Sequence, residues 1–168
     1  TSEKIIGKKS GENFANELLT LLILILLFIV LIVEIFTPFF VSIIAPGFVS
    51  DLNKFNLAVE LTKITFPFLF FVSLSSFFSG ILNSNNKFAA AAGAPIFLNL
   101  ILIFALLISS YFKLDYAKNL SYGVTFAGLF QLIFLIVVVK RYYQPKIILK
   151  RKISRQVKFF FIKLLPSI

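Results

Sequence analysis

Residues 61–99 read LTKITFPFLFFVSLSSFFSGILNSNNKFAAAAGAPIFLN, and this stretch decides the fold. It holds two long apolar runs joined by the short polar loop 83–87. Such a loop predicts an antiparallel pair of helices, since Asn caps helices and tolerates the left-handed conformation. Prolines, small residues and an asparagine lie where a plain lipid-facing helix would carry Leu or Phe. The stretch therefore predicts two interrupted membrane helices.

The composition of the whole chain is also typical of a membrane protein. Of its 168 residues, 59% are hydrophobic and 14% are charged, whereas soluble domains are about half apolar and a quarter charged. The chain has no His and no Cys, and its seven acidic residues are scattered singly. These absences remove the commonest general base and metal ligands. We therefore expect no enzyme, and no catalytic residue, metal site or cofactor.

The apolar runs predict an all-α integral membrane bundle with four complete spans. We place these spans at about 17–36, 61–82, 88–112 and 120–139, after a polar lead-in at 1–16. Each is long enough to cross a hydrocarbon core of about 30 Å. Glu34 is the one acid within an apolar run, and its position near the end of the first span lets it reach the interface.

Two further segments connect and follow these spans. Segment 37–60 is expected at the membrane interface, with a turn at Pro46, Gly47 and Phe48 and then a surface amphipathic helix. After the fourth span comes a basic loop at 140–158, and residues 159–168 open a truncated fifth helix. The chain contains no Met, and we expect an interior piece of a longer protein.

The distribution of Lys and Arg predicts the orientation of the bundle. The lead-in, loop 83–87 and loop 140–158 together carry twelve basic residues, against four on the opposite side. Cytoplasmic loops are enriched in basic residues, so these three segments are predicted to be cytoplasmic. The basic loop is then a topological anchor, with binding of an anionic lipid headgroup as the alternative. No aromatic platform is interleaved with a basic groove in the way that single-strand binders need, so nucleic acid is not an expected partner.

The second span carries small and polar residues on one face. Ser73, Ser76, Gly80 and Asn83 are spaced three, four and three apart, which aligns them along a helix. Small residues let a neighbouring helix approach closely, so we interpret this face as a packing surface. Leu at Gly80 or Ser76 should then block packing within the hairpin. The alternative is a polar face that lines a substrate groove.

Prolines interrupt the second and third spans. Pro67 lies in the first third of one, and Pro95 follows the small run 89–94 in the other. A proline break survives in a membrane where neighbouring groups satisfy the freed carbonyl. Asn99, four residues after Pro95, is expected to bond to backbone or to a neighbouring helix. A hinge in a rocking transporter is the alternative.

The order of these motifs resembles the MurJ/MviN family of peptidoglycan lipid II flippases. The matching elements are APGF at 45–48, KITFP at 63–67, GILNS at 80–84, NKF at 86–88, PIFLN at 95–99 and, more loosely, the run from Gly123 to Gln131. Several elements occur in order at the family's spacing, and they cover nearly the whole chain. The Ala run at 89–92 and Glu34 depart from the family's pattern.

The resemblance implies a piece of a larger transporter of the MOP exporter superfamily. The implied activity is alternating-access movement of an undecaprenyl-pyrophosphate-linked precursor from the inner to the outer leaflet of the bacterial inner membrane. Its partners would be membrane lipid and the remaining helices of the same protein. The family's functional basic residues lie on other helices, so no substrate-binding residue is carried over to this chain. Another MOP-type exporter, of polysaccharide-lipids or drugs, and a non-transporting scaffold are the alternatives.

Overall fold

The computed structural model describes residues 2–148, 154, 157–159 and 162, and within these residues it contains helices and loops but no strand. The elements in chain order are α1 (Ser2–Ile35), α2 (Thr37–Ile44), the short 3-10 helix η1 (Pro46–Phe48), α3 (Leu52–Thr65), α4 (Pro67–Ser84), α5 (Phe88–Gly93), α6 (Ile96–Phe112) and α7 (Tyr116–Val139). Most of the predicted fifth helix at 159–168 lies outside the described residues.

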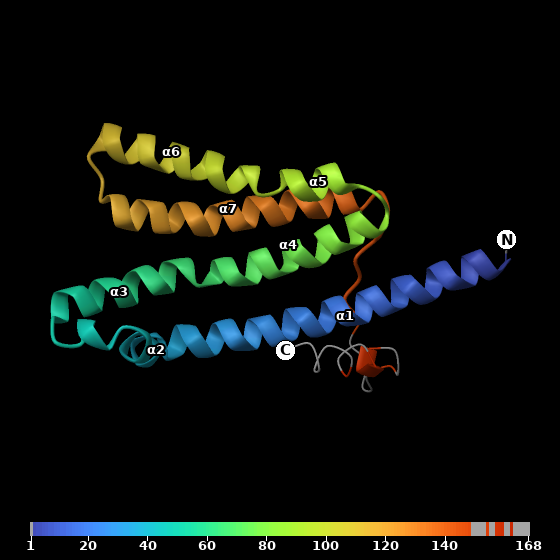
Figure 1. Cartoon of the computed structure of the whole chain (residues 1–168), viewed down its shortest axis with the longest axis horizontal. Coiled ribbons are helices and arrows are strands. Elements are labelled where there is room, and N and C mark those ends of the chain that lie inside the picture. Colours follow the sequence, from blue (N-terminus) through green and yellow to red (C-terminus); the bar gives the residue numbers. More distant parts are fainter. Residues whose placement is uncertain (1, 149–153, 155–156, 160–161, 163–168) are drawn as a thin grey trace.

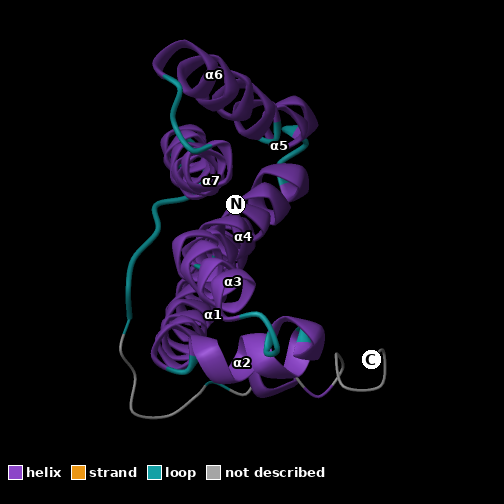
Figure 2. Ribbon diagram, turned by 90° about the vertical axis from the view of Figure 1, so that its left-hand side faces the viewer, coloured by secondary structure: helices purple, strands orange, loops and turns teal. Residues whose placement is uncertain are grey.

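The long helices run back and forth in a single curved layer (Figures 1 and 2). Across the layer the order is α6, α7, α4 and α1, with α3 continuing the line of α4 and α5 that of α6. Four helical stretches are long and apolar enough to cross a membrane: Ser10–Ile35, Leu52–Ser84, Phe88–Phe112 and Tyr116–Val139. The prediction of an all-α membrane bundle with four spans is therefore confirmed.

The segment expected as a surface helix leads into the second span, as the sequence predicts, and it does so with almost no interruption. The Asp51 carboxylate caps α3 by accepting hydrogen bonds from the backbone N–H groups of Asn53 and Lys54, at 3.1 and 3.2 Å. Phe66 at the far end keeps helical dihedral angles, with φ −60° and ψ −36°. Pro67 then takes the first position of α4, where its missing N–H costs little. Helix α3 therefore runs into α4 almost without a break.

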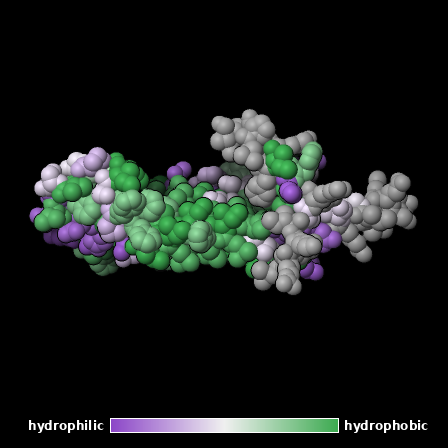
Figure 3. Space-filling view, turned by 90° about the horizontal axis from the view of Figure 1, so that it is seen from below, coloured by the Kyte–Doolittle hydropathy of each residue, from purple (hydrophilic) through white to green (hydrophobic). Residues whose placement is uncertain are grey.

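Helix α7 lies at the centre of the layer and carries much of the buried surface. Leu132, Leu135 and Val139 pack with Leu74, Phe78 and Leu82 of α4 and with Leu19 of α1. The outer faces of the layer expose large apolar side chains. Figure 3 shows such an apolar surface across the middle of the molecule, with polar residues toward the two ends. An apolar belt between polar ends is the pattern expected of a membrane-spanning bundle.

Side-chain hydroxyls bond to carbonyls beside the proline breaks. Pro38 has no N–H for the carbonyl of Glu34, and the Thr37 hydroxyl donates to that carbonyl at 3.0 Å and to Val33 O at 2.7 Å. Next to Pro67, the Thr125 hydroxyl of α7 donates to the carbonyl of Ile64. A backbone polar group in hydrocarbon has no water to bond to, so these contacts make the breaks tolerable.

Side-chain hydrogen bonds also join α6 to α7 next to the turn between them. The Asn119 side-chain amide donates to the Ala105 carbonyl at 2.9 Å and to the Ser109 hydroxyl oxygen at 2.6 Å. Ser109 is fully buried, and its own hydroxyl donates to the Ala105 carbonyl at 2.8 Å. These hydrogen bonds hold the last two spans together at the end of the bundle where they are joined.

Gly128 permits the close approach of α4 and α7. A Cβ atom at this position would lie 2.6 Å from the Phe68 ring and 3.2 Å from the Phe71 Cβ, whereas a Cβ at Gly80 would meet nothing within 4 Å. We expect Gly128→Ala to lower the free energy of unfolding by about 1–3 kcal/mol through overpacking. Gly80→Ala is the matched control and should be no less stable than the parent. Thermal unfolding of the purified full-length variants measures the difference, and equal loss in both would contradict this packing.

Thr125→Val should remove the hydrogen bond to Ile64 while keeping the shape of the side chain. Interhelical hydrogen bonds in membranes contribute about 0.6 kcal/mol on average and up to about 1.7 kcal/mol. We expect a loss in that range when the variant is unfolded reversibly in mixed micelles. Ser76→Ala is the control, because the Ser76 hydroxyl bonds only to Val72 O of its own helix. An unchanged stability in Thr125→Val would show that this contact does not support the break.

Candidate functional site

The small face of α4 does not form the packing surface that we expected. Ser76, Gly80 and Asn83 are exposed, and a Cβ at Gly80 would touch no neighbour. Helix α4 instead packs through another face, which carries the buried residues Leu74, Ser75, Phe78 and Leu82. Large apolar side chains on that face fill the space toward α1 and α7. The prediction of close packing at Gly80 is therefore wrong among the described helices, and the groove alternative stays a prediction.

The structure bears out the predicted turns but changes the residues responsible. Pro46, Gly47 and Phe48 form the exposed turn η1, yet no described glycine has a positive φ. In the loop 83–87, Asn86 takes the left-handed conformation with φ 58°. Lys113 does the same between α6 and α7, with φ 53°. Asn and Lys therefore supply the left-handed residues, although glycine adopts this conformation most easily.

The break at Pro95 is present, without the expected role for Asn99. Pro95 separates α5 from α6, and Leu98 N donates to the Pro95 carbonyl at 3.1 Å, which tightens this turn. The Asn99 side chain is exposed and forms no hydrogen bond with another described residue. Glu34 is half-buried, and its Oε1 atom has no hydrogen-bond partner among the described residues.

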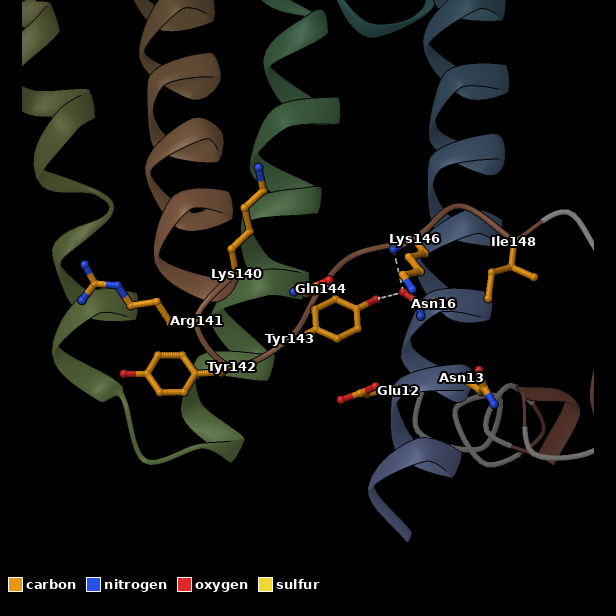
Figure 4. A pocket seen from close by; sticks show the side chains of 10 residues that line it. All are labelled: Glu12, Asn13, Asn16, Lys140, Arg141, Tyr142, Tyr143, Gln144, Lys146 and Ile148. Atoms are coloured by element: carbon orange, nitrogen blue, oxygen red, sulfur yellow. Dashed lines mark hydrogen bonds between the residues drawn. The ribbon is translucent and has the colours of Figure 1, made fainter. Parts of the chain in front are cut away.

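A polar pocket lies between α1 and the segment that follows α7 (Figure 4). Its volume is about 330 Å³. The lining residues are Glu12, Asn13, Asn16, Lys140, Arg141, Tyr142, Tyr143, Gln144, Lys146 and Ile148. Figure 4 shows Tyr143 pointing toward α1, whereas Arg141 and Tyr142 point the other way. The pocket is thus a polar seam between two parts of the chain, and its basic side chains do not converge on one point.

Buried polar side chains of α1 form one wall of this seam. The Asn16 carboxamide oxygen accepts hydrogen bonds from the Tyr143 hydroxyl and, at 2.8 Å, from the backbone N–H of Lys146. The Thr20 hydroxyl oxygen accepts from the backbone N–H of Ile148 at 2.9 Å. Asn16, Thr20 and Tyr143 are each at most 5% exposed. Buried polar groups of this kind are costly unless they are paired, and here each of them is paired.

Burial keeps the Tyr143 hydroxyl protonated, as its role of donor requires. Loss of water around the phenol, and secondly the negative charge of Glu12, raise the pKa of Tyr143 to about 12. The neutral form is therefore favoured in the folded state. Stability from this shift is fully present below the ordinary pKa of tyrosine near 10 and is lost as the pH rises toward 12.

A second, mostly apolar pocket opens at the same end of the bundle. It has a volume of about 460 Å³ and is lined by Asn86, Lys87, Phe88, Ala89, Ala90, Val138 and Tyr142. The Lys87 ammonium lies 5.5 Å from the centre of the Tyr142 ring, within range of a cation–π interaction. This contact ties the loop between α4 and α5 to the end of α7.

Our sequence analysis missed the residues of the polar seam. The sequence predicts a polar lead-in at 1–16, but α1 includes residues 2–16, and Asn16, Glu17 and Thr20 are buried. A signal was present, because three polar residues at positions i, i+1 and i+4 lie at the very start of an apolar helix. Their partners, the backbone N–H groups of Lys146 and Ile148, cannot be recognised from the sequence.

The structure and its sites define a class of protein. Four apolar helices with broken, hydrogen-bonded interruptions describe a polytopic α-helical membrane protein. No group of three or more His, Cys, Asp or Glu side chains that could hold a metal ion occurs within the described part of the chain. The seam and the second pocket both lie at the end that carries most of the basic residues.

Comparison with known proteins gives the family. The family model described as "Lipid II flippase MurJ" matches residues 1–168, and the chain belongs to this family. A protein of Rickettsia prowazekii named "Probable lipid II flippase MurJ" is 41% identical over 82% of this chain and 27% of its own length. A protein of the same name from Rhizobium tropici is 43% identical over 75% of this chain and 24% of its own length. The chain thus spans about a quarter of the length of these relatives.

Tyr143→Phe tests the seam directly. The substitution removes the hydroxyl donor to Asn16 but keeps the ring, so we expect a loss of about 1 kcal/mol in the free energy of unfolding. Tyr142→Phe is the matched control, because a phenyl ring still faces Lys87. Thermal unfolding of both full-length variants at neutral pH measures the effect. Equal stability of Tyr143→Phe and the parent would show that the buried hydroxyl contributes nothing.

Proposed function

We propose that this chain is part of a transporter that moves the lipid-linked peptidoglycan precursor lipid II from the inner to the outer leaflet of the bacterial inner membrane. The observation that carries the proposal is the match of the MurJ family model to all 168 residues. The named relatives support it, as do the four spans with their proline breaks. Movement by alternating access fits a bundle of packed helices that can rock as a body.

The described helices support the structure of the transporter and do not themselves bind the pyrophosphate group of the substrate. Such a headgroup needs converging cations or backbone N–H groups. Lys54 and Lys63 are the basic residues within Leu52–Ser84, and both are exposed, while the other described basic residues lie near the ends of the helices. We propose that the precursor is bound by helices beyond this chain, against which this bundle packs.

The orientation is proposed from charge and supported by the arrangement of the ends. The start of α1, the loop before α5 and the segment after α7 lie at one end of the bundle, and η1 and the α6–α7 turn lie at the other (Figure 1). Those first three segments are the ones with the excess of Lys and Arg. We propose that this end is cytoplasmic.

Complementation tests the substrate. The full-length gene should restore growth to bacteria depleted of their own lipid II flippase, because lipid II then reaches the outer leaflet again. A version that lacks residues 61–139 is the control and should not restore growth. A well-expressed, membrane-inserted full-length protein that fails to rescue would overturn the proposed substrate, and a drug or polysaccharide-lipid exporter would take its place.

Single cysteines test the orientation, since this chain has none of its own. Asn85→Cys and Gly47→Cys, each in a cysteine-free version of the full-length protein, place exposed thiols at opposite ends. A membrane-impermeant maleimide added to intact spheroplasts should label position 47 and spare position 85. Labelling after lysis controls for reactivity. The reverse pattern would contradict the proposed orientation.

A further inference from the structure

Side chains of α1 hold the segment after α7 mainly through the backbone N–H groups of that segment. The Asn16 oxygen accepts from the N–H of Lys146, the Thr20 oxygen from the N–H of Ile148, and a Glu17 carboxylate oxygen from the N–H of Ser154. All three acceptors are at most 5% exposed. We call Asn16, Glu17 and Thr20 the docking strip, and the described residues 143–148 together with Ser154 the strap.

The contacts explain why an irregular segment can be held there. Residues 144–148 belong to no helix, so their N–H groups need partners from elsewhere. The N–H groups of Lys146 and Ile148 are two residues apart, which is the spacing at which an extended chain repeats its direction. The side chains of Lys146 and Ile147 are exposed. At residues 146–148 the strip therefore binds the backbone, and the exposed side chains of Lys146 and Ile147 are free to vary.

The strap ends in a new helical turn against the bundle. The Ser154 hydroxyl oxygen accepts from the N–H of Val157 at 3.4 Å, and the Ser154 carbonyl accepts from the N–H of Lys158 at 3.0 Å. Val157 is fully buried. Ser154 is therefore held by Glu17 on one side and begins a helical turn on the other.

We propose that the docking strip keeps the strap bound to α1 throughout the transport cycle, so that the chain beyond residue 158 moves from a fixed attachment on this bundle. Undocking would leave buried polar groups on α1 without partners, and such groups are expensive in an apolar setting. The Tyr143 hydroxyl adds a further contact to Asn16 at the start of the strap. The reference to a transport cycle rests on the proposed function, but the docking itself does not.

Hydrogen exchange of the full-length protein in nanodiscs tests the docking. The amides of Lys146 and Ile148 should exchange at least about tenfold more slowly in the parent than in Asn16→Leu/Thr20→Val, a factor equivalent to about 1.4 kcal/mol. Ile148→Pro removes the donor N–H and should speed exchange at Lys146, whereas Ile148→Ala keeps the N–H and should leave it unchanged. Equal exchange in all four proteins would overturn the docking.

A reversible cross-link tests whether the strap stays docked. Thr20→Cys/Ile148→Cys, in a cysteine-free full-length background, is joined by a short thiol cross-linker that reducing agent cleaves. If the strap is static, the cross-linked protein should restore lipid II exposure in flippase-depleted spheroplasts to within about twofold of its reduced form. Loss of activity that reduction restores would overturn the proposal. Inactivity of both forms, with an inactive cysteine-free parent, would instead overturn the proposed function, and the exchange experiment would still decide the docking.

Discussion

The structure depends on one constraint: backbone and buried side-chain polar groups in a bilayer must find partners within the protein. Helices meet this constraint along their length, but the chain interrupts its helices at Pro38, Pro67 and Pro95. The break at Pro38 uses the neighbouring Thr37 hydroxyl, and the break at Pro67 uses Thr125 from α7. The second solution joins distant parts of the chain, so satisfying the backbone also fixes how the spans are arranged.

The same constraint explains the two ends of the bundle. At one end, Asn119 joins α6 to α7 through Ser109 and the Ala105 carbonyl. At the other end, the buried side chains of α1 bind N–H groups of a segment that forms no helix. Between these two sets of hydrogen bonds the helices pack through apolar side chains. Gly128 allows α4 to approach α7 closely. In lipid, apolar contacts alone do little to fix how one helix is aligned against another, and these hydrogen bonds fix that alignment.

A single layer of helices leaves both of its faces without a protein neighbour among the described residues. The exposed apolar side chains on α1, α6 and α7 suit lipid tails or further helices of the same protein. The chain spans about a quarter of the length of the relatives that it matches. The small face of α4, which carries Ser76 and Gly80, is one of the open surfaces. The groove along this face stays a prediction.

The sequence alone determined the class of protein, the four spans and the positions of their breaks. Hydrophobic runs, prolines and loop residues act locally, so their effect can be predicted from neighbours in the chain. Only the tertiary structure decided which face of α4 is buried, because small residues suit a packed helix and an open groove equally well. It also decided that Asn16 and Thr20 are buried partners of Lys146 and Ile148. These pairs join residues well over a hundred positions apart through backbone N–H groups, which carry no sequence signal.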